Sequence, residues 1–240
     1  MKWASITNVG SRMINEDSVG IIEQDGSICF VVADGLGGHG KGDVASRLAV
    51  ETFEKEFKNT EQPVEKRIDD AFMNTNQVII DEQKKDYAQM QMKTTAVALV
   101  THEDSVFWGH IGDSRLYAFT FWGVKERTID HSVPQMLVLS KEIREKEIRN
   151  HPDRNKLLRV LGVAGTAPRF DVSEKKEMKK YKAFLLCTDG FWELILEKEM
   201  TACLRKAKSP EEWLAKMETI VRKRGEGIEM DNYSAIGVII

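Results

Sequence analysis

The sequence predicts a fold of the α+β class, with mainly antiparallel sheet covered by amphipathic helices. Apolar runs at 19–23 and 28–33 flank an Asp-Gly turn at 25–26. An Asp-Gly turn between two apolar segments is a strong hairpin signal, and strands joined by tight turns pair antiparallel. Longer segments follow, at 43–58 and 63–85, in which apolar residues recur at helical spacing.

Strands are expected wherever a short apolar run is bounded by turn residues. Such runs occur at 3–7, 19–23, 28–33, 94–100, 105–111, 115–121, 124–129, 183–188 and 234–240. Tight turns join the four runs between residues 94 and 129, which predicts one antiparallel meander in that part of the sheet.

Two amphipathic helices are expected to cover the sheet. Asp43 is predicted to cap the first, which ends near residue 58, and Pro63 to open the second, which ends near residue 85. Their apolar faces are Val44, Leu48, Phe53 and Phe57 in the first helix and Ile68, Phe72, Val78 and Ile79 in the second. Further helices are expected at about 197–206 and 210–223.

Residues 133–161 are predicted to form an appended flap within a single domain that spans 1–240. The segment is short, helical and heavily charged, above all at 141–147. It offers only a small apolar surface, so it is not expected to build a second core.

The bulk composition is that of an ordinary soluble globular protein. The chain has 240 residues, of which 42% are hydrophobic and 30% are charged, and its net charge of −3 argues against a nucleic-acid binder. Its three cysteines form no CxxC pair, and an odd count suits no disulfide framework, so the cytoplasm is the expected compartment. No signal peptide and no membrane-spanning segment is recognisable, and we expect a monomer that binds no membrane.

Acidic residues recur where apolar strands meet turns. They are Asp34 and Asp189 after strands, Asp231 and the pair Glu16-Asp17 before strands, and Asp113 between two strands. In a hairpin the start of the first strand lies beside the end of the second, so Glu16 and Asp17 are expected near Asp34. The same argument sets Thr95 beside Asp113. If neighbouring strands are antiparallel, all of these acids gather at one end of the sheet.

A cluster of uncompensated carboxylates repels itself and needs cations. Oxygen ligands without a set of histidines or cysteines favour Mg²⁺ or Mn²⁺ over Ca²⁺. A carboxylate that bridges two such ions about 3.5–4 Å apart would hold and acidify a water molecule for attack on phosphorus. Arg12, four residues before Glu16, offers a planar fork to two phosphate oxygens.

The order of these motifs resembles that of metal-dependent Ser/Thr protein phosphatases of the type 2C class, and the chain looks like a bacterial single-domain member. The motifs are Arg-x-x-Asn-Glu-Asp at 12–17, Asp-Gly-x-Gly-Gly-His at 34–39, Thr-Thr at 94–95, Gly-Asp-Ser-Arg at 112–115, Asp-His-Ser at 130–132, Asp-Gly at 189–190 and Asp-Asn at 231–232. The match covers nearly the whole chain. It implies a four-layer α-β-β-α sandwich of two mainly antiparallel sheets flanked by helices, with a two-metal site at one end.

The resemblance also implies roles for single residues and for partners. Asp34 would bridge two Mn²⁺ or Mg²⁺ ions, with Asp189 and Asp231 on the first and the carbonyl of Gly35 on the second. Glu16 would act through water, Asp17 would support it, and Asp113 with Asp189 would hold a weaker third ion. Arg12 would bind the substrate phosphate, and residues 133–161 would border the cleft. The expected substrates are phosphoproteins, among them a Hanks-type Ser/Thr kinase and its targets.

Three positions depart from parts of that family. Leu36 stands where many eukaryotic members carry a histidine proposed as general acid, so the proton donor is unassigned. His39, five positions after Asp34, is expected to make local hydrogen bonds and not to act as a ligand. Glu193 stands where some members have an aspartate, which puts its part in the third metal site in doubt.

The expected reaction is hydrolysis of phosphoproteins by water activated at two metals, without a phospho-enzyme intermediate. Two other functions are alternatives to it. A non-catalytic phosphopeptide-binding domain on the same fold would lack Asp34, Asp189 or Asp231, and all three are present. A phosphatase of anti-sigma-factor antagonists would generally lack the flap and Arg12. A Cys-x5-Arg nucleophile loop is absent, because no arginine follows Cys29 at the required spacing.

Overall fold

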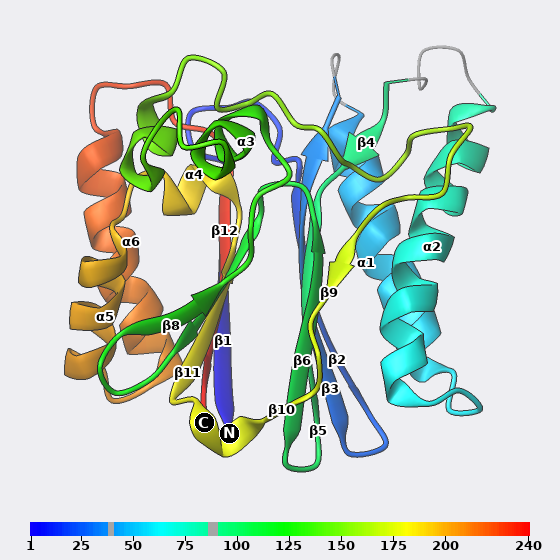
Figure 1. Ribbon diagram of the computed structural model, residues 1–240, viewed down its shortest axis with the longest axis horizontal. Coiled ribbons are helices and arrows are strands. Elements are labelled where there is room, and N and C mark those ends of the chain that lie inside the picture. The colour runs from blue at the N-terminus through cyan, green and yellow to red at the C-terminus, as the bar shows by residue number, and fades with distance from the viewer. Residues whose placement is uncertain (38–40, 86–90) are drawn as a thin grey trace.

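Two β-sheets packed face to face, with helices on both outer sides, make up the molecule (Figure 1). This computed structural model describes residues 1–37, 41–85 and 91–240. The four layers and the mainly antiparallel pairing are those predicted from the sequence.

The first sheet has five strands, and helices from the C-terminal part of the chain cover its outer face (Figure 1). Its strands, in spatial order, are β1 (Lys2–Asn8), β12 (Tyr233–Ile239), β11 (Ala183–Cys187), β7 (Arg115–Phe119) and β8 (Val124–Arg127). The covering helices are α4 (Asp189–Trp192), α5 (Glu197–Lys206) and α6 (Pro210–Gly225). As predicted, α6 begins after Ser209, whose hydroxyl accepts a hydrogen bond from the backbone N–H of Glu212 (3.3 Å).

The second sheet has seven strands, and the two long helices of the N-terminal half cover it. Its main order is β10 (Lys176–Glu177), β6 (Ser105–Ile111), β5 (Ala96–His102), β3 (Ser27–Leu36) and β2 (Asp17–Gln24). In addition, β4 (Lys93–Thr94) pairs with β3, and β9 (Asp171–Val172) pairs with β6. The helices are α1 (Gly42–Lys58) and α2 (Val64–Gln83).

Apolar side chains fill all three spaces between the four layers. Between the sheets lie Phe30, Val32, Leu116, Leu186 and Ile236, each fully buried. Burial of a side chain of this size contributes roughly 1.5–3 kcal/mol, so the facing sheets form a rigid platform for the residues at their ends.

Most details of the two long helices agree with the sequence prediction, with two corrections. Asp43 does not cap α1: the helix begins at Gly42 after Lys41, and Asp43 lies in its first turn. A carboxylate in the first turn is still favourable, because it faces the positive end of the helix dipole. Val78 lies off the apolar stripe of α2 with 37% of its surface exposed, whereas Ile79 is buried.

The predicted meander is wrong at residues 112–114. β5 and β6 form the expected hairpin, but β7 pairs with β8 and β11 in the other sheet, so the chain crosses between sheets after Ile111. Gly112 makes the crossing with φ of +98°, and an added Cβ would lie 2.5 Å from Cγ2 of Thr95. The Gly-Asp-Ser sequence is typical of a hairpin turn, but here it connects two stacked sheets.

The segment predicted as a flap lies over one end of the sheets, and both termini lie at the other end (Figure 1). It contains α3 (Val133–Leu139) and the 3₁₀ helix η2 (Glu145–Asn150). A second short 3₁₀ helix, η3 (Met178–Lys180), precedes β11. In the described part of the chain, no helix has the length and apolarity needed to cross a membrane.

Candidate active site

A pocket of about 180 Å³ opens at the end of the sheets where the predicted acids meet. Its lining is Arg12, Glu16, Asp34, Gly35, Leu36, Gly37, Asp113, Asn155, Leu157, Asp189, Asp231 and Asn232. Every residue predicted for the site lines this pocket except Asp17, which is buried directly behind it. His39 lies outside the described residues.

Asp34 is placed by the end of β3 and by the two threonines of the Thr-Thr motif. It pairs in register with Asp17 at the start of β2, as the hairpin argument predicts. The backbone N–H of Thr95 and the hydroxyl of Thr94 both donate to the carbonyl oxygen of Asp34, at 2.9 and 2.8 Å. These hydrogen bonds fix the backbone of Asp34 from the neighbouring segment.

Gly35 is required by the close approach of three backbone segments. A Cβ at this position would lie 2.0 Å from the carbonyl oxygen of Gly42 and 2.6 Å from that of Glu16. The N–H of Gly35 donates to the carbonyl of Glu16 (3.0 Å), and the N–H of Gly42 donates to the Glu16 carboxylate (3.0 Å). Glu16 is thus held between β3 and the first residue of α1.

Asp189 and Asp231 come from the other sheet. Asp189 begins α4 directly after β11, and Asp231 precedes β12. Asn232 ties this side to the first motif, because its side-chain oxygen accepts the N–H of Glu16 (2.8 Å) and its amide donates to the carbonyl of Ile14 (3.0 Å). Arg12 donates to a carboxylate oxygen of Asp231 (2.9 Å).

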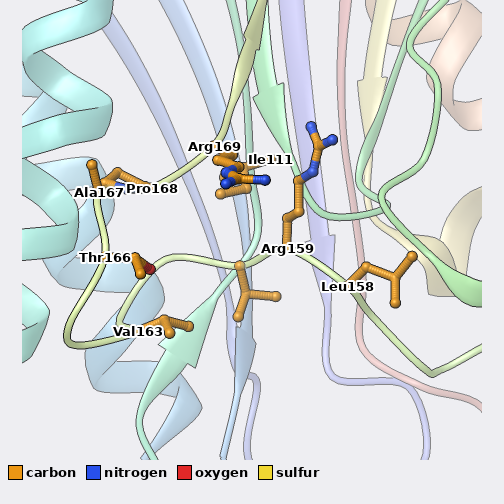
Figure 2. Close-up of a pocket in the computed structure, with 9 residues that line it drawn as sticks. Ile111, Leu158, Arg159, Val163, Thr166, Ala167, Pro168 and Arg169 are labelled. Atoms are coloured by element: carbon orange, nitrogen blue, oxygen red, sulfur yellow. The ribbon is translucent and has the colours of Figure 1, made fainter.

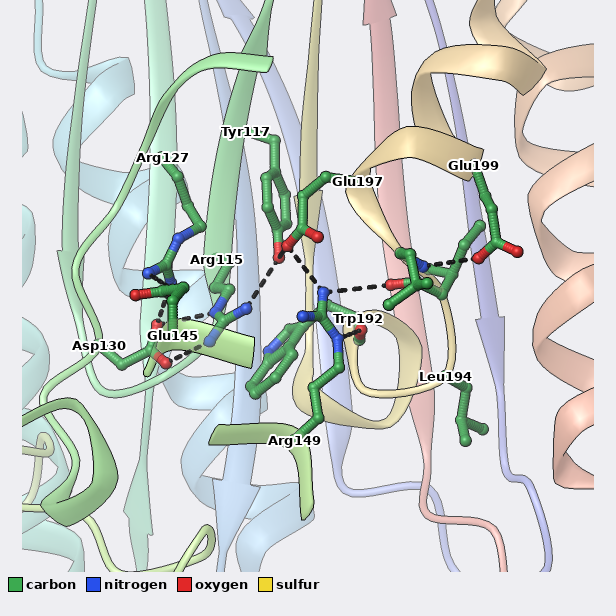
Figure 3. A network of polar contacts seen from close by, with 12 residues as sticks. Arg115, Tyr117, Arg127, Asp130, Glu145, Arg149, Trp192, Leu194, Glu197 and Glu199 are labelled. Carbon is green, nitrogen blue, oxygen red and sulfur yellow. Dashed lines mark hydrogen bonds and ion pairs between the residues drawn. The ribbon is translucent and has the colours of Figure 1, made fainter. Parts of the chain in front are cut away.

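Asp113 lies on the crossing between the sheets, where a polar network supports it. The indole N–H of Trp192 donates to the carbonyl of Asp113 (3.0 Å). Arg115, stacked 3.4 Å above the Trp192 ring, donates to both oxygens of Asp130 at 2.8 and 2.6 Å (Figure 3). This fully buried pair keeps the crossing in place. Thr95 contacts Ser114 of the same crossing through their hydroxyls (2.7 Å), close to its predicted position beside Asp113.

The site holds more negative charge than the protein compensates. Burial, together with neighbouring carboxylates, raises the pKa of Asp34 and Asp113 well above the usual range and also raises the pKa of Asp189. Burial likewise raises the pKa of Asp17 to about 7. Oδ1 of Asp17 is buried without a hydrogen-bond partner, while Oδ2 accepts from Thr188 (2.9 Å). An excess of carboxylate oxygens with an unsatisfied buried atom fits hard divalent cations.

Glu193 lies four residues after Asp189, directly after the end of α4. Burial and the charge of Asp189 raise its pKa to about 7, and Arg154 of the flap pairs with it (3.2 Å). Glu193 does not line the pocket.

A second group with ligand atoms near one another, His110, His131 and Asp171, lies outside this pocket. Three of its four ring nitrogens have partners: Nε2 of His110 lies 2.7 Å from the carbonyl of Ile129, Nε2 of His131 lies 3.0 Å from Asp171, and Nδ1 of His131 accepts the N–H of Gly112 (3.2 Å). The two imidazole rings are stacked with centroids 4.6 Å apart. The group therefore serves as a hydrogen-bonded link between β6, the start of the flap and β9.

Several residues at the site were missed by the reasoning from sequence. Asn155 and Leu157 of the flap line the pocket, but neither belongs to a recognisable motif. Thr94, Thr188 and Asn232 position the acids. Of these, Thr94 and Asn232 stood in the motifs and could have been found from that signal.

A family model described as protein phosphatase 2C matches residues 7–230. The chain belongs to the protein phosphatase 2C family. It is 32% identical to the serine/threonine phosphatase Stp of Listeria welshimeri over 206 residues, which covers 82% of this chain and 80% of that protein. As a member of this family, the chain is a metal-dependent protein phosphatase.

Solved structures of this class of phosphatase share the fold. The crystal structure of serine/threonine phosphatase Stp1 from Staphylococcus aureus superposes with a TM-score of 0.91 at 26% identity, covering 100% of this chain and 95% of that one. The catalytic domain of PstP in complex with two manganese ions gives a TM-score of 0.80 at 24% identity, with 100% and 98% covered.

Proposed function

We propose that this serine/threonine phosphatase hydrolyses phosphoserine and phosphothreonine in proteins with two divalent cations held in the pocket. Asp34, Asp189 and Asp231 would hold them with the carbonyl of Gly35. The observation that carries the proposal is that one pocket joins these residues from both sheets without enough positive charge to balance them. The two manganese ions in the PstP complex support the number and the kind of ion.

The remaining acids of the site have supporting parts in this proposal. Glu16, which lines the pocket, would act through water, and the buried Asp17 would support it. Asp113 with Asp189 would hold a weaker third cation. When bound, divalent cations lower the pKa of water and neutralise phosphate charge.

Arg12 would orient the phosphate at the mouth of the pocket. Its side chain is 47% exposed, and its Nη2 contacts the half-exposed Asp231. A planar guanidinium in this position can bind two phosphate oxygens while it stays anchored to a ligand residue. Water would attack phosphorus in line without a phospho-enzyme. The three cysteines are buried and so are not available as nucleophiles.

We further propose that the flap at 133–161 borders the substrate cleft of a single catalytic domain. Asn155 and Leu157 of the flap support this, since both line the pocket. Phosphoproteins of a Hanks-type kinase pathway, including the kinase, would be the substrates, and the reduced, buried cysteines suit a cytoplasmic location.

Hydrolysis of a phosphothreonine peptide in Mn²⁺, Mg²⁺ and chelator tests the proposal. We expect turnover with either ion and none after chelation, with recovery when the ion is restored. Activity that is indifferent to chelation would contradict a metal-centred site.

A further inference from the structure

We propose that a groove beside the active site, carrying Arg159 and Arg169, binds a carboxylate side chain of the substrate close to its phosphorylated residue. The inference rests on the proposed function, because it names a feature of the polypeptide that enters the same site. Neither arginine belongs to the motifs that carry the resemblance to the family.

The groove has a volume of about 320 Å³ and lies between the end of the flap and the stretch of chain that follows it. Figure 2 shows Leu158 and Arg159 on one stretch and Val163, Thr166, Ala167, Pro168 and Arg169 along the other. Ile111 at the end of β6 is part of the lining. Leu158 and Val163 expose 53% and 41% of their surface, so the groove offers apolar contact as well as charge.

The groove adjoins the catalytic pocket. Leu157 lines the pocket and Leu158 lines the groove, and likewise Asp113 lines the pocket and Ile111 the groove. Neighbouring Cα atoms are about 3.8 Å apart, and an extended peptide advances about 3.3 Å per residue. A substrate whose phosphate lies in the pocket can therefore place a residue a few positions away in the groove.

The charges around the groove favour an anion. Arg169 is exposed and has no ion-pair partner among the described residues. Nη1 of Arg159 lies 3.3 Å from Nε2 of His131 and makes a long ion pair with Oδ1 of Asp171 (3.5 Å), while its Nε and Nη2 have no protein partner among the described residues.

Asp171 is the acid that faces Arg159, and its other oxygen is hydrogen-bonded to His131. Two guanidinium groups against one carboxylate leave a net positive groove. A carboxylate of the substrate can pair with one of these guanidinium groups through two parallel N–H···O bonds. A lysine or arginine of the substrate would be repelled.

Three phosphothreonine peptides test the proposal. They are identical except for the few residues on each side of the phosphothreonine that could reach the groove. These residues are all glutamate in the first peptide, all glutamine in the second and all lysine in the third. We would measure kcat/KM in Mn²⁺ for the full chain, for Arg169→Gln and for the double variant Arg159→Gln/Arg169→Gln. Arg222→Gln on the exposed face of α6 is the matched control, and p-nitrophenyl phosphate is a substrate that cannot reach the groove.

The expected order of kcat/KM for the unmodified chain is glutamate, then glutamine, then lysine. Each arginine should contribute about two- to fivefold to the preference for glutamate over glutamine, as partly exposed ion pairs do. Arg169→Gln should lower this preference and the double variant should remove it, while Arg222→Gln leaves it unchanged. High salt should reduce the preference in the unmodified chain.

Equal kcat/KM for the glutamate and glutamine peptides would overturn the proposal, as would a preference that survives the double variant. A parallel loss of activity on p-nitrophenyl phosphate in Arg169→Gln would also overturn it, because the arginine would then act on the catalytic site itself. Failure of the proposed function gives a different result, in which no variant or peptide shows metal-dependent turnover.

Discussion

Asp34 is a half-buried carboxylate at the end of β3 whose charged neighbours are other carboxylates, which is costly for the metal-free fold. The protein tolerates this cost by fixing the backbone of Asp34 through hydrogen bonds from Thr94 and Thr95. A residue kept in such an unfavourable position indicates a function that needs it there.

Asp34→Asn should separate the catalytic role of this carboxylate from its structural cost. Turnover should fall by more than about 100-fold, because a bridging ligand is a larger loss than a change behind the ligands. In chelator the variant should unfold at a temperature at least as high as the unmodified chain, since it lacks one buried negative charge.

Hydrolysis of a phosphothreonine peptide in Mn²⁺ measures the loss of turnover, and thermal unfolding with and without Mn²⁺ measures the change in stability. Asp81→Asn, an exposed residue of α2 paired with Lys84, is the matched control. If Mn²⁺ stabilises Asp34→Asn as much as it stabilises the unmodified chain, Asp34 is not a metal ligand.

At the scale of elements, local pairing was predictable and the choice of sheet was not. The hairpin of β2 and β3 followed from a two-residue turn, and it correctly placed Asp17 opposite Asp34. The sequence does not distinguish the crossing at 112–114 from a hairpin turn, because both use the same turn residues. They differ only in the strand that pairs with β7, which is β11 here and would be β6 in a hairpin. This error does not change the expected gathering of the acids, since Asp113 lines the same pocket whether the chain turns back or crosses between the sheets.

The flap residues of the pocket were beyond the sequence argument for a different reason. Asn155 and Leu157 lie in irregular structure, where no periodicity links a residue to a face. Their position depends on long-range contacts, such as the pairing of Ser132 with Leu157. Arg149 adds another by donating to the carbonyls of Trp192 and Ile195 (Figure 3).

Asp130→Asn tests how the crossing is held. The substitution leaves Arg115 buried without its counter-charge, which should destabilise the fold by about 3–5 kcal/mol. Urea denaturation measures the change in the free energy of unfolding. Asp153→Asn, in the flap and paired only with exposed Lys156, should leave stability unchanged. An equal, small effect of both substitutions would show that the buried pair does not hold the crossing.

For the whole molecule, the stacked histidines predict a loss of stability on acidification. Burial, together with the neighbouring His131, lowers the pKa of His110 to about 4, below the value of about 6.5 expected in the unfolded chain. As the pH falls from about 6.5 to 4, the unfolded chain binds this proton first. The stability contributed by neutral His110 is complete above pH 6.5 and is lost progressively down to pH 4.

His110→Gln should flatten that dependence while it keeps a donor for the carbonyl of Ile129. From pH 7 to 4, the decrease in the free energy of unfolding should be smaller than in the unmodified chain, by at most about 3 kcal/mol. The same substitution at half-buried His102 is the control. Parallel curves for His110→Gln and the unmodified chain would rule out His110 as the source.

The activity of the whole molecule depends on the acids brought together from both sheets, which we propose hold divalent cations. Anomalous scattering at the manganese edge, from crystals soaked in Mn²⁺, tests this directly by locating each ion. We expect two strong peaks in the pocket lined by Asp34, Gly35, Asp189 and Asp231, with a weaker third beside Asp113. A pocket without a manganese peak at saturating Mn²⁺, or ions held only at His110 and His131, would contradict the account.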